Sequence, residues 1–357
     1  GALPLLPEAV RTRSALTCGA DLVFALPAPC ACAGAEAFAR AGVALLAAAG
    51  CDGLVFGAET PDAALLMEAA ELLDSGSYRA ALKAQLAGGA RSFAAARQAA
   101  AAQLASDERV AALLDKPNNN LAVEYCKAII EQNVEMQPIA LPRQGADHGQ
   151  ALTESAHAAF ASASALRALW AEGGAAALAP YVPEKALKLY KQAEYDGKYT
   201  DFAVMGHCEL ALLRAACAGQ APFAAVRGVS EGLEHRLENA VRETASLPTL
   251  LDALTTVRYP RARMRRLAMD AALGYTAQTP ALPPYLHLLG ARKEALSLPG
   301  ETALPLSHSL ARLARENESC AQMAAAQSRA SDLGALCRAK PEPMGGIYRQ
   351  KIIFLTN

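Results

Sequence analysis

The sequence has few aromatic residues, few charges and no apolar run long enough to span a bilayer. Of its 357 residues, 5% are aromatic and 19% are charged. The longest apolar candidate, residues 42–50, is about half of the roughly 20 residues that a spanning helix needs, so we expect no membrane partner. The hydrophobic share of 53% excludes a disordered chain, and 84 alanines predict closely packed helices.

Common signatures of nucleotide and hydrolase sites are also missing. The sequence contains no Gly-x-Gly-x-x-Gly, no Walker loop and no Gly-x-Ser-x-Gly. Its nine cysteines are scattered apart from Cys30 and Cys32, and its six histidines have no metal-ligand spacing. We therefore expect no protein metal site, reduced thiols and a cytoplasmic location.

The net charge of −1 results from a cancellation between the two halves. Residues 1–175 hold 12 Lys and Arg against 18 Asp and Glu, a net charge of −6, whereas residues 176–357 hold 22 against 17, a net charge of +5. The positive excess favours a polyanionic partner for the second half. An uneven distribution of solvated surface charge gives the same numbers and stays an alternative.

Short apolar runs alternate with helical patterns through the first half. The strand candidates are residues 22–26, 53–56 and 138–141, and the helical patterns include residues 35–49, 61–73 and 92–105. This alternation predicts an α/β fold with a parallel sheet. Ligands bind such sheets beyond the carboxyl ends of the strands, here residues 57–59 and 143–145.

Helical spacing dominates after Gly173 and Gly174. The helical patterns cover residues 183–195, 206–218, 230–245, 247–256 and 260–273, and strand patterns occur at residues 285–289 and 351–355. We therefore predict two domains, an α/β domain over residues 1–174 and a mostly α-helical domain over residues 175–357.

Three successive asparagines, Asn118 to Asn120, follow Pro117 at a predicted helix start. One Asn is a common N-cap, so a capped helix explains part of the pattern. Three exceed what capping needs. Their amides can bind the polar edges of a ligand, while unpaired N–H groups of the first turn can bind an anion such as phosphate.

Two further strings have chemistry that suits phosphate. Small residues and hydroxyls open a helix at residues 161–167, where Ser164 and Arg167 can approach an anion; an ordinary Ser-capped helix is the alternative. Residues 258–266 hold five arginines, whose planar guanidinium groups suit phosphate, although a solvated basic face has the same pattern. They are Arg258, Arg261, Arg263, Arg265 and Arg266.

In their order along the chain, these strings resemble the bacterial tRNA(Met) cytidine acetate ligases, a family with the HIGH-type nucleotidylyltransferase site. The matching segments span nearly the whole chain: residues 19–27, 51–59, 117–125, 143–146, 161–167, 231–237, 258–266 and 285–290. The ordered series is far more specific than any one segment.

The resemblance implies a Rossmann-like nucleotidylyltransferase domain that binds ATP, with Mg²⁺, and a helical domain that binds tRNA. It implies that ATP activates acetate as acetyl-adenylate, and that the acetyl group passes to N4 of the wobble cytidine of elongator tRNA(Met). Carried over by position, the ATP-binding residues are Gly57, Asn118, Asn119, Arg143 and Gln144. Ser164 and Arg167 fall on the segment similar to a KMSKS-type, pyrophosphate-binding loop, and the five arginines are candidates for tRNA contacts.

The family begins with a strand and a Pro-Phe-His-x-Gly-His stretch ahead of the segment that Gly1 to Pro4 resembles. Neither has a counterpart in this sequence, so we expect the chain as given to bind nucleotide weakly and to be catalytically inactive, and the natural full-length protein to be active. Two alternatives stay open: a nucleotidylyltransferase acting on a small-molecule acid or phosphate, and a catalytically inactive RNA-binding relative.

Overall fold

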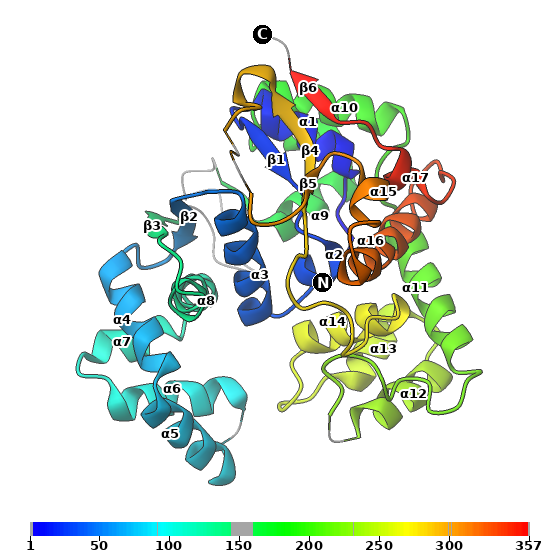
Figure 1. The fold of residues 1–357 in the computed structure, drawn as a ribbon. Helices are drawn as coiled ribbons and strands as arrows, with labels where there is room; N and C mark the ends of the chain where they lie inside the picture. The colour runs from blue at the N-terminus through cyan, green and yellow to red at the C-terminus, as the bar shows by residue number, and fades with distance from the viewer. Residues whose placement is uncertain are drawn as a thin grey trace.

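The strands form two separate small sheets (Figure 1). The computed structural model describes residues 3–90, 92–143, 160–230, 232–298, 300 and 302–355. In one sheet, β2 (Gly53–Ala58) runs parallel to β3 (Gln137–Pro142). In the other, β4 (Leu286–Arg292) pairs antiparallel with β1 (Leu22–Phe24) and parallel with β5 (Leu306–Ser307) and β6 (Ile353–Leu355).

The placement of β1 differs from the sequence prediction. The α/β fold class is confirmed and all three predicted strands of the first half form, but the expectation that they share one parallel sheet is wrong. Strand β1 instead pairs with β4, on which helix α1 (Glu8–Thr17) packs so closely that a Cβ on Gly290 would lie 2.7 Å from Thr12 Cγ2. These partners lie near opposite ends of the chain, where no local pattern reveals their pairing.

Three helices pack around the β2–β3 sheet: α3 (Ala35–Ala48), α4 (Ala63–Asp74) and α8 (Pro117–Glu131). Ala39, Ala69, Ala70 and Ala122 lie in this core and are at most 1% exposed. Their small side chains let the helices approach closely, as the composition predicts. The helices α5 (Gly76–Ala87), α6 (Phe93–Leu104) and α7 (Glu108–Leu113) extend this part of the molecule.

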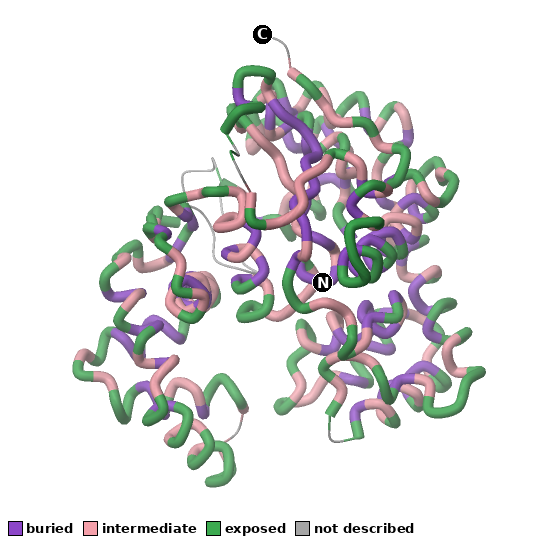
Figure 2. Tube along the Cα trace, in the orientation of Figure 1, coloured by how far each residue is buried: buried purple, intermediate pink, exposed green. Residues whose placement is uncertain are grey.

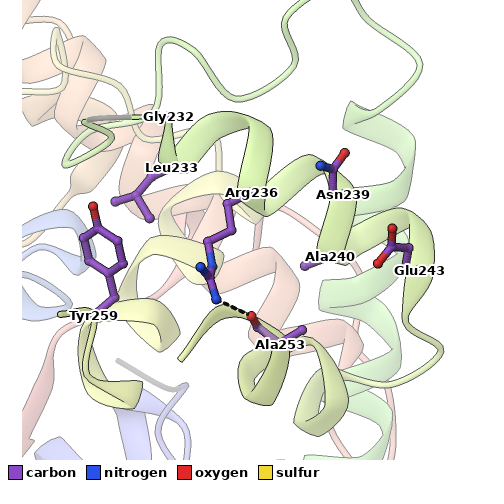
Figure 3. Close-up of a pocket in the computed structure, with 8 residues that line it drawn as sticks. All are labelled: Gly232, Leu233, Arg236, Asn239, Ala240, Glu243, Ala253 and Tyr259. Atoms are coloured by element: carbon purple, nitrogen blue, oxygen red, sulfur yellow. Dashed lines mark hydrogen bonds between the residues drawn. The ribbon is translucent and has the colours of Figure 1, made fainter. Parts of the chain in front are cut away.

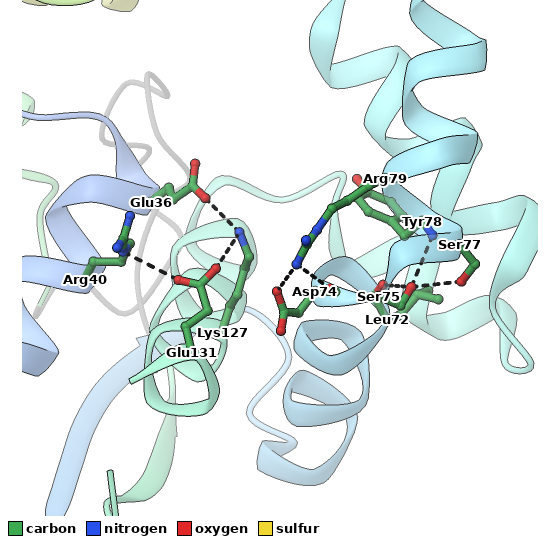
Figure 4. Close-up of polar contacts among 10 residues, drawn as sticks. All are labelled: Glu36, Arg40, Leu72, Asp74, Ser75, Ser77, Tyr78, Arg79, Lys127 and Glu131. Atoms are coloured by element: carbon green, nitrogen blue, oxygen red, sulfur yellow. Dashed lines mark hydrogen bonds and ion pairs between the residues drawn. The ribbon is translucent and has the colours of Figure 1, made fainter. Parts of the chain in front are cut away.

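Ion pairs also join α3 to α8 (Figure 4). Lys127 on α8 lies 2.7 Å from Glu36 on α3 and 3.2 Å from Glu131, which in turn lies 3.5 Å from Arg40. The Lys127 side chain is only 15% exposed, so its ammonium group is held between the two helices. This network fixes the position of α8 relative to α3.

The β2–β3 sheet is buried on one face only (Figure 2). Leu54 and Phe56 are each 8% exposed, whereas Val55 between them is 57% exposed, the two-residue alternation of a half-buried strand. On the buried face, the ring of Phe56 packs against Tyr125 of α8, with 5.5 Å between the ring centroids. This contact holds β2 against α8.

Four helices of the second half enclose a core of their own: α11 (Phe202–Ala216), α12 (Leu233–Glu243), α13 (Leu247–Leu254) and α14 (Arg261–Ala272). Leu213, Leu237 and Leu250 are completely buried in it. Asp201 and Ser246 cap α11 and α13 by accepting backbone N–H groups. The mostly helical second half is thereby confirmed.

The remaining helices lie in the same part of the molecule as the β4 sheet (Figure 1). They are α2 (Ala28–Ala31), α9 (Ala163–Gly173), α10 (Glu184–Tyr195), α15 (Leu310–Leu313), α16 (Glu318–Leu336) and α17 (Gly346–Arg349), with the 3₁₀ helices η1 (Ala175–Leu178) and η2 (Lys293–Ala295). One apolar cluster joins Cys30 and Ala41 to Tyr285 and Met323, so the packing crosses the predicted boundary at residue 174. Within the described ranges, no helix is long and apolar enough to cross a membrane.

Candidate functional site

The ends of β2 and β3 meet the start of α8 at one surface. Glu59 directly follows β2 and Arg143 directly follows β3, where the Arg143 N–H donates to the Ala58 carbonyl at 2.9 Å. Gly57 is exposed, and a Cβ built on it would meet no atom within 4 Å. The backbone of β2 is therefore open to a ligand at the sheet edge where parallel strands bind their ligands.

The Glu59 carboxylate closes the first turn of α8. Its Oε1 accepts the Asn118 N–H at 3.1 Å and the Asn118 side-chain amide at 2.6 Å, and its Oε2 accepts the Asn119 N–H at 2.6 Å. Pro117 has no N–H, and the Asn120 N–H already donates to a backbone carbonyl. The expectation of unpaired N–H groups for a phosphate is therefore wrong, because a carboxylate from the end of β2 occupies that position.

The neighbouring asparagines, Asn118 and Asn119, have different surroundings. Asn119 is 1% exposed, and its side chain is paired at both ends with Thr60: Oδ1 accepts the Thr60 N–H at 2.9 Å and Nδ2 donates to Thr60 Oγ1 at 3.1 Å. Asn118 is half-buried, and its Oδ1 accepts from Arg143 Nη1 at 3.0 Å. The Asn118 side chain is therefore also paired at both ends, with Glu59 and Arg143, but it lies closer to the surface, while buried Asn119 holds the β2 end against α8.

Opposite charges flank Asn118. Burial raises the pKa of Glu59, but hydrogen bonds from the Asn118 side chain and from the backbone N–H groups of Asn118 and Asn119 outweigh it and hold that pKa below its usual value. The exposed Arg143 guanidinium lies on the other side of Asn118. The ionised Glu59 carboxylate thus holds Asn118 and Asn119 in place, and the Arg143 guanidinium faces the solvent.

Glu59 and Thr60 are functional candidates that the sequence interpretation did not single out. The parallel-sheet rule selects residues 57–59 as a place to look, and an acidic residue directly after a strand was the available signal. What the sequence does not reveal is that Glu59 reaches the start of α8, because the two segments are distant along the chain. Gly57, Asn118, Asn119 and Arg143 do come together as predicted, whereas Gln144 lies outside the described residues.

Ser164 and Arg167 lie at the start of α9. Ser162 caps this helix by accepting the Ala165 N–H at 3.2 Å, and its hydroxyl lies 3.0 Å from the Ser164 hydroxyl. Arg167 donates to the Ala163 carbonyl, also at 3.2 Å. These side-chain bonds stay within α9, so the capped-helix alternative describes the local structure, and a role in binding pyrophosphate stays a prediction.

The five arginines of residues 258–266 have different surroundings. Arg258 is exposed, with its guanidinium 5.8 Å from the centre of the Tyr259 ring, and that of Arg263 lies 5.2 Å from the same ring. Arg261 pairs with Asp252 across to α13 and is half-exposed. These three arginines lie at the surface, where a polyanion can reach them.

Arg265 and Arg266 are more buried. The Arg265 side chain is 15% exposed and pairs with Glu209 on α11, whose side chain is completely buried. Burial lowers the pKa of Arg266. Arg265 therefore neutralises a carboxylate inside the helical core, and its position favours a structural role.

No group of three or more His, Cys, Asp or Glu side chains in the described part of the chain is arranged to hold a metal ion.

The chain is similar to known proteins over most of its length. Residues 1–344 match the family model described as HIGH Nucleotidyl Transferase. A protein from Syntrophotalea carbinolica, named tRNA(Met) cytidine acetate ligase, is 31% identical over 319 residues, which are 87% of this chain and 74% of that protein. A protein of the same name from Listeria monocytogenes is 30% identical over 293 residues, 81% of this chain and 72% of that protein.

Solved structures have the same fold. The crystal structure of Thermotoga maritima TmcAL bound with alpha-thio ATP matches with a TM-score of 0.87 and 22% identity, covering 99% of this chain and 88% of that one. The apo form of that protein matches with a TM-score of 0.88 and 24% identity, covering 99% and 89%. At this sequence identity, the similarity to the solved structures establishes the fold of the chain and not the roles of its individual residues.

Proposed function

Because the chain belongs to the HIGH nucleotidyl transferases and, among them, to the tRNA(Met) cytidine acetate ligase family, we propose that it is an ATP-dependent enzyme that acetylates a cytidine of tRNA(Met). In the proposed reaction, an acetate oxygen attacks the α-phosphorus of ATP and pyrophosphate leaves. The N4 amine of the wobble cytidine then attacks the acetyl carbon, loses a proton, and AMP leaves. Mg²⁺ would accompany the triphosphate, and a cytoplasmic location would follow from the tRNA substrate.

The cluster of Gly57, Glu59, Asn118 and Arg143 is the observation that supports an ATP site at the ends of β2 and β3. The open backbone at Gly57 lets a ligand approach the strand closely. Asn118 can bind a polar edge of the nucleotide, and Arg143 supplies positive charge. We assign Asn119 a positioning role, because its side chain is 1% exposed and paired with Thr60.

The surface arginines support the proposed tRNA contacts. Arg258, Arg261 and Arg263 lie on the helical part of the molecule, in the half of the sequence with a net charge of +5. Such contacts to phosphates give affinity without reading sequence. We leave Arg265 out of this set because its guanidinium is paired with buried Glu209, and Gln144, Ser164, Arg167 and Arg266 stay candidates.

The test is to incubate the natural gene product with ATP, acetate and tRNA(Met) and to look for N4-acetylcytidine by mass spectrometry. The product should require all three substrates. ATP–pyrophosphate exchange that depends on another acid and ignores tRNA would instead identify a small-molecule nucleotidylyltransferase. RNA binding without exchange or acetylation, where a relative is active, would identify an inactive RNA-binding protein.

A further inference from the structure

Two of the segments that carry the family resemblance meet at a pocket that the proposed reaction does not use (Figure 3). The pocket has a volume of about 460 Å³ and lies between α12 and α13. Gly232, Leu233 and Arg236 come from the segment 231–237, and Tyr259 comes from the arginine-rich run. Asn239, Ala240, Glu243 and Ala253 complete the lining.

One end of the pocket is aromatic and cationic. The Tyr259 ring lines it, and the guanidinium groups of Arg258 and Arg263 lie 5.8 and 5.2 Å from the ring centre. Leu233, which is 1% exposed, forms an apolar wall beside the ring. This end combines a flat hydrophobic surface with nearby positive charge.

Polar groups follow along α12. Arg236 donates to the Ala253 carbonyl at 2.7 Å, yet its Nε is buried with no hydrogen-bond partner in the described structure. Asn239 lies one turn further along and is exposed, and among the described residues no hydrogen bond uses its side-chain amide. The exposed Glu243 carboxylate stands at the far end (Figure 3). The pocket therefore runs from a cationic, aromatic end past Arg236 and the Asn239 amide to an acidic end.

We infer that this pocket receives one unpaired nucleobase of the RNA substrate. The base would lie against Tyr259, with its polar edge toward Arg236 and Asn239. Its phosphates would lie at the Arg258 and Arg263 end, since Glu243 repels phosphate from the other end. The inference rests on the proposed tRNA substrate and adds a second contact, separate from the cytidine that is modified.

A nucleobase fits this chemistry better than a free small anion. A pocket of this volume is in the range that small-molecule ligands occupy. A free anion would gain nothing from the Tyr259 face or the Leu233 wall and would be repelled by Glu243. A base can contact the apolar surface of Tyr259 and Leu233 and hydrogen-bond with the Asn239 amide, while its charged phosphate stays outside the pocket.

The test compares RNA binding by Tyr259→Ala, Tyr259→Phe and Tyr195→Ala, the last changing a tyrosine that is 84% exposed elsewhere. Fluorescence anisotropy would measure binding to a single-stranded 12-mer, to tRNA(Met) and to an RNA duplex. We expect Tyr259→Ala to weaken binding of the first two by about tenfold or more, because stacking is lost. Binding to the duplex should be unchanged, since it has no unpaired base to insert, and the two control variants should match the unaltered protein.

Equal affinities for Tyr259→Ala and the unaltered protein, or an equal loss on the duplex, would overturn the inference. If Tyr259→Ala does not fold by circular dichroism, the exposed Asn239→Ala takes its place, with an expected loss of about threefold or more on single-stranded RNA alone. Failure of the unaltered protein to bind any RNA would overturn both the pocket and the proposed tRNA substrate. If the unaltered protein binds RNA and the variant at Tyr259 or Asn239 binds it equally well, the nucleobase pocket is refuted and the proposed tRNA substrate is not.

Discussion

Glu59 decides which groups at the ends of β2 and β3 are available to a ligand. Its carboxylate takes two backbone N–H groups and one side-chain amide at the start of α8. A helix that would otherwise attract a phosphate is closed, and the positive charge of the site comes from Arg143. We therefore expect Glu59 to act through Asn118 and Asn119 as a positioning residue.

Glu59→Gln should destabilise the protein by about 1–2 kcal/mol, because a glutamine amide N–H₂ cannot accept the N–H group that one carboxylate oxygen accepts now. Urea unfolding at pH 7 would measure the free energy of unfolding. Glu71→Gln is a matched control on α4, an exposed glutamate with no hydrogen bond in the described structure. Equal stabilities of the two variants would contradict the capping role.

The stabilisation by Glu59 should depend on pH in a defined direction. The pKa of Glu59 in the folded protein lies below the ordinary glutamate value that it has in the unfolded chain, so the unfolded chain binds the proton more readily. The contribution is therefore fully present above that value and is lost as the pH falls through the lower, folded pKa. Unfolding curves at several pH values from 6 downward should show the difference between wild type and Glu59→Gln shrinking, and a difference that grows on acidification would refute the assignment.

Substitutions of the two asparagines beside Glu59 should have different effects on ATP binding and on stability. Asn118→Ala should weaken ATP binding, measured by isothermal titration calorimetry, and should affect unfolding less than Asn119→Ala does, because the Asn118 side chain is only half-buried. Asn119→Ala should lower the free energy of unfolding by about 1–3 kcal/mol, since it removes both hydrogen bonds that the buried Asn119 side chain makes with Thr60. If Asn119→Ala weakened ATP binding while leaving stability unchanged, the assignment would be reversed.

At the scale of elements, α14 shows what the sequence predicts and what it does not. The apolar spacing of residues 260–273 predicts the helix, and Met264 and Leu267 are buried as that spacing requires. The arginine content predicts a basic surface, but the buried carboxylate of Glu209 on α11 turns Arg265 inward. The direction in which such a side chain points depends on a partner from an element that is distant along the chain. The same is true of the pairing of β1 with β4 and of the capping of α8 by Glu59.

The inward and outward arginines of the 258–266 run should respond differently to substitution. Arg265→Ala leaves Glu209 buried and unpaired, which should cost about 3–5 kcal/mol of stability in urea unfolding. Arg258→Ala should leave stability nearly unchanged but reduce the salt dependence of tRNA binding, by about one unit in the slope of log affinity against log salt. If Arg265→Ala were as stable as the unaltered protein but bound tRNA more weakly, Arg265 would be assigned to the tRNA-binding surface.

At the scale of the whole molecule, the ends of the chain share one core. Cys30 and Ala41 pack with Tyr285 and Met323, and β1 pairs with β4. The charge difference between the halves of the sequence does not divide the packing at residue 174. The division into residues 1–174 and 175–357 as independently folding domains stays a prediction, and the shared core makes it testable.

The shared core predicts that a fragment of residues 175–357 will not fold cooperatively by itself. It would expose the face of β4 that α1 covers and would leave the Tyr285 cluster without Cys30 and Ala41. Thermal unfolding followed by circular dichroism should show a broad transition for this fragment, and mixing it with residues 1–174 should restore a sharp one. The separate core of α11 to α14 would survive in the fragment, so helical signal alone is no evidence of folding. A sharp transition of the isolated fragment would establish residues 175–357 as an autonomous domain after all.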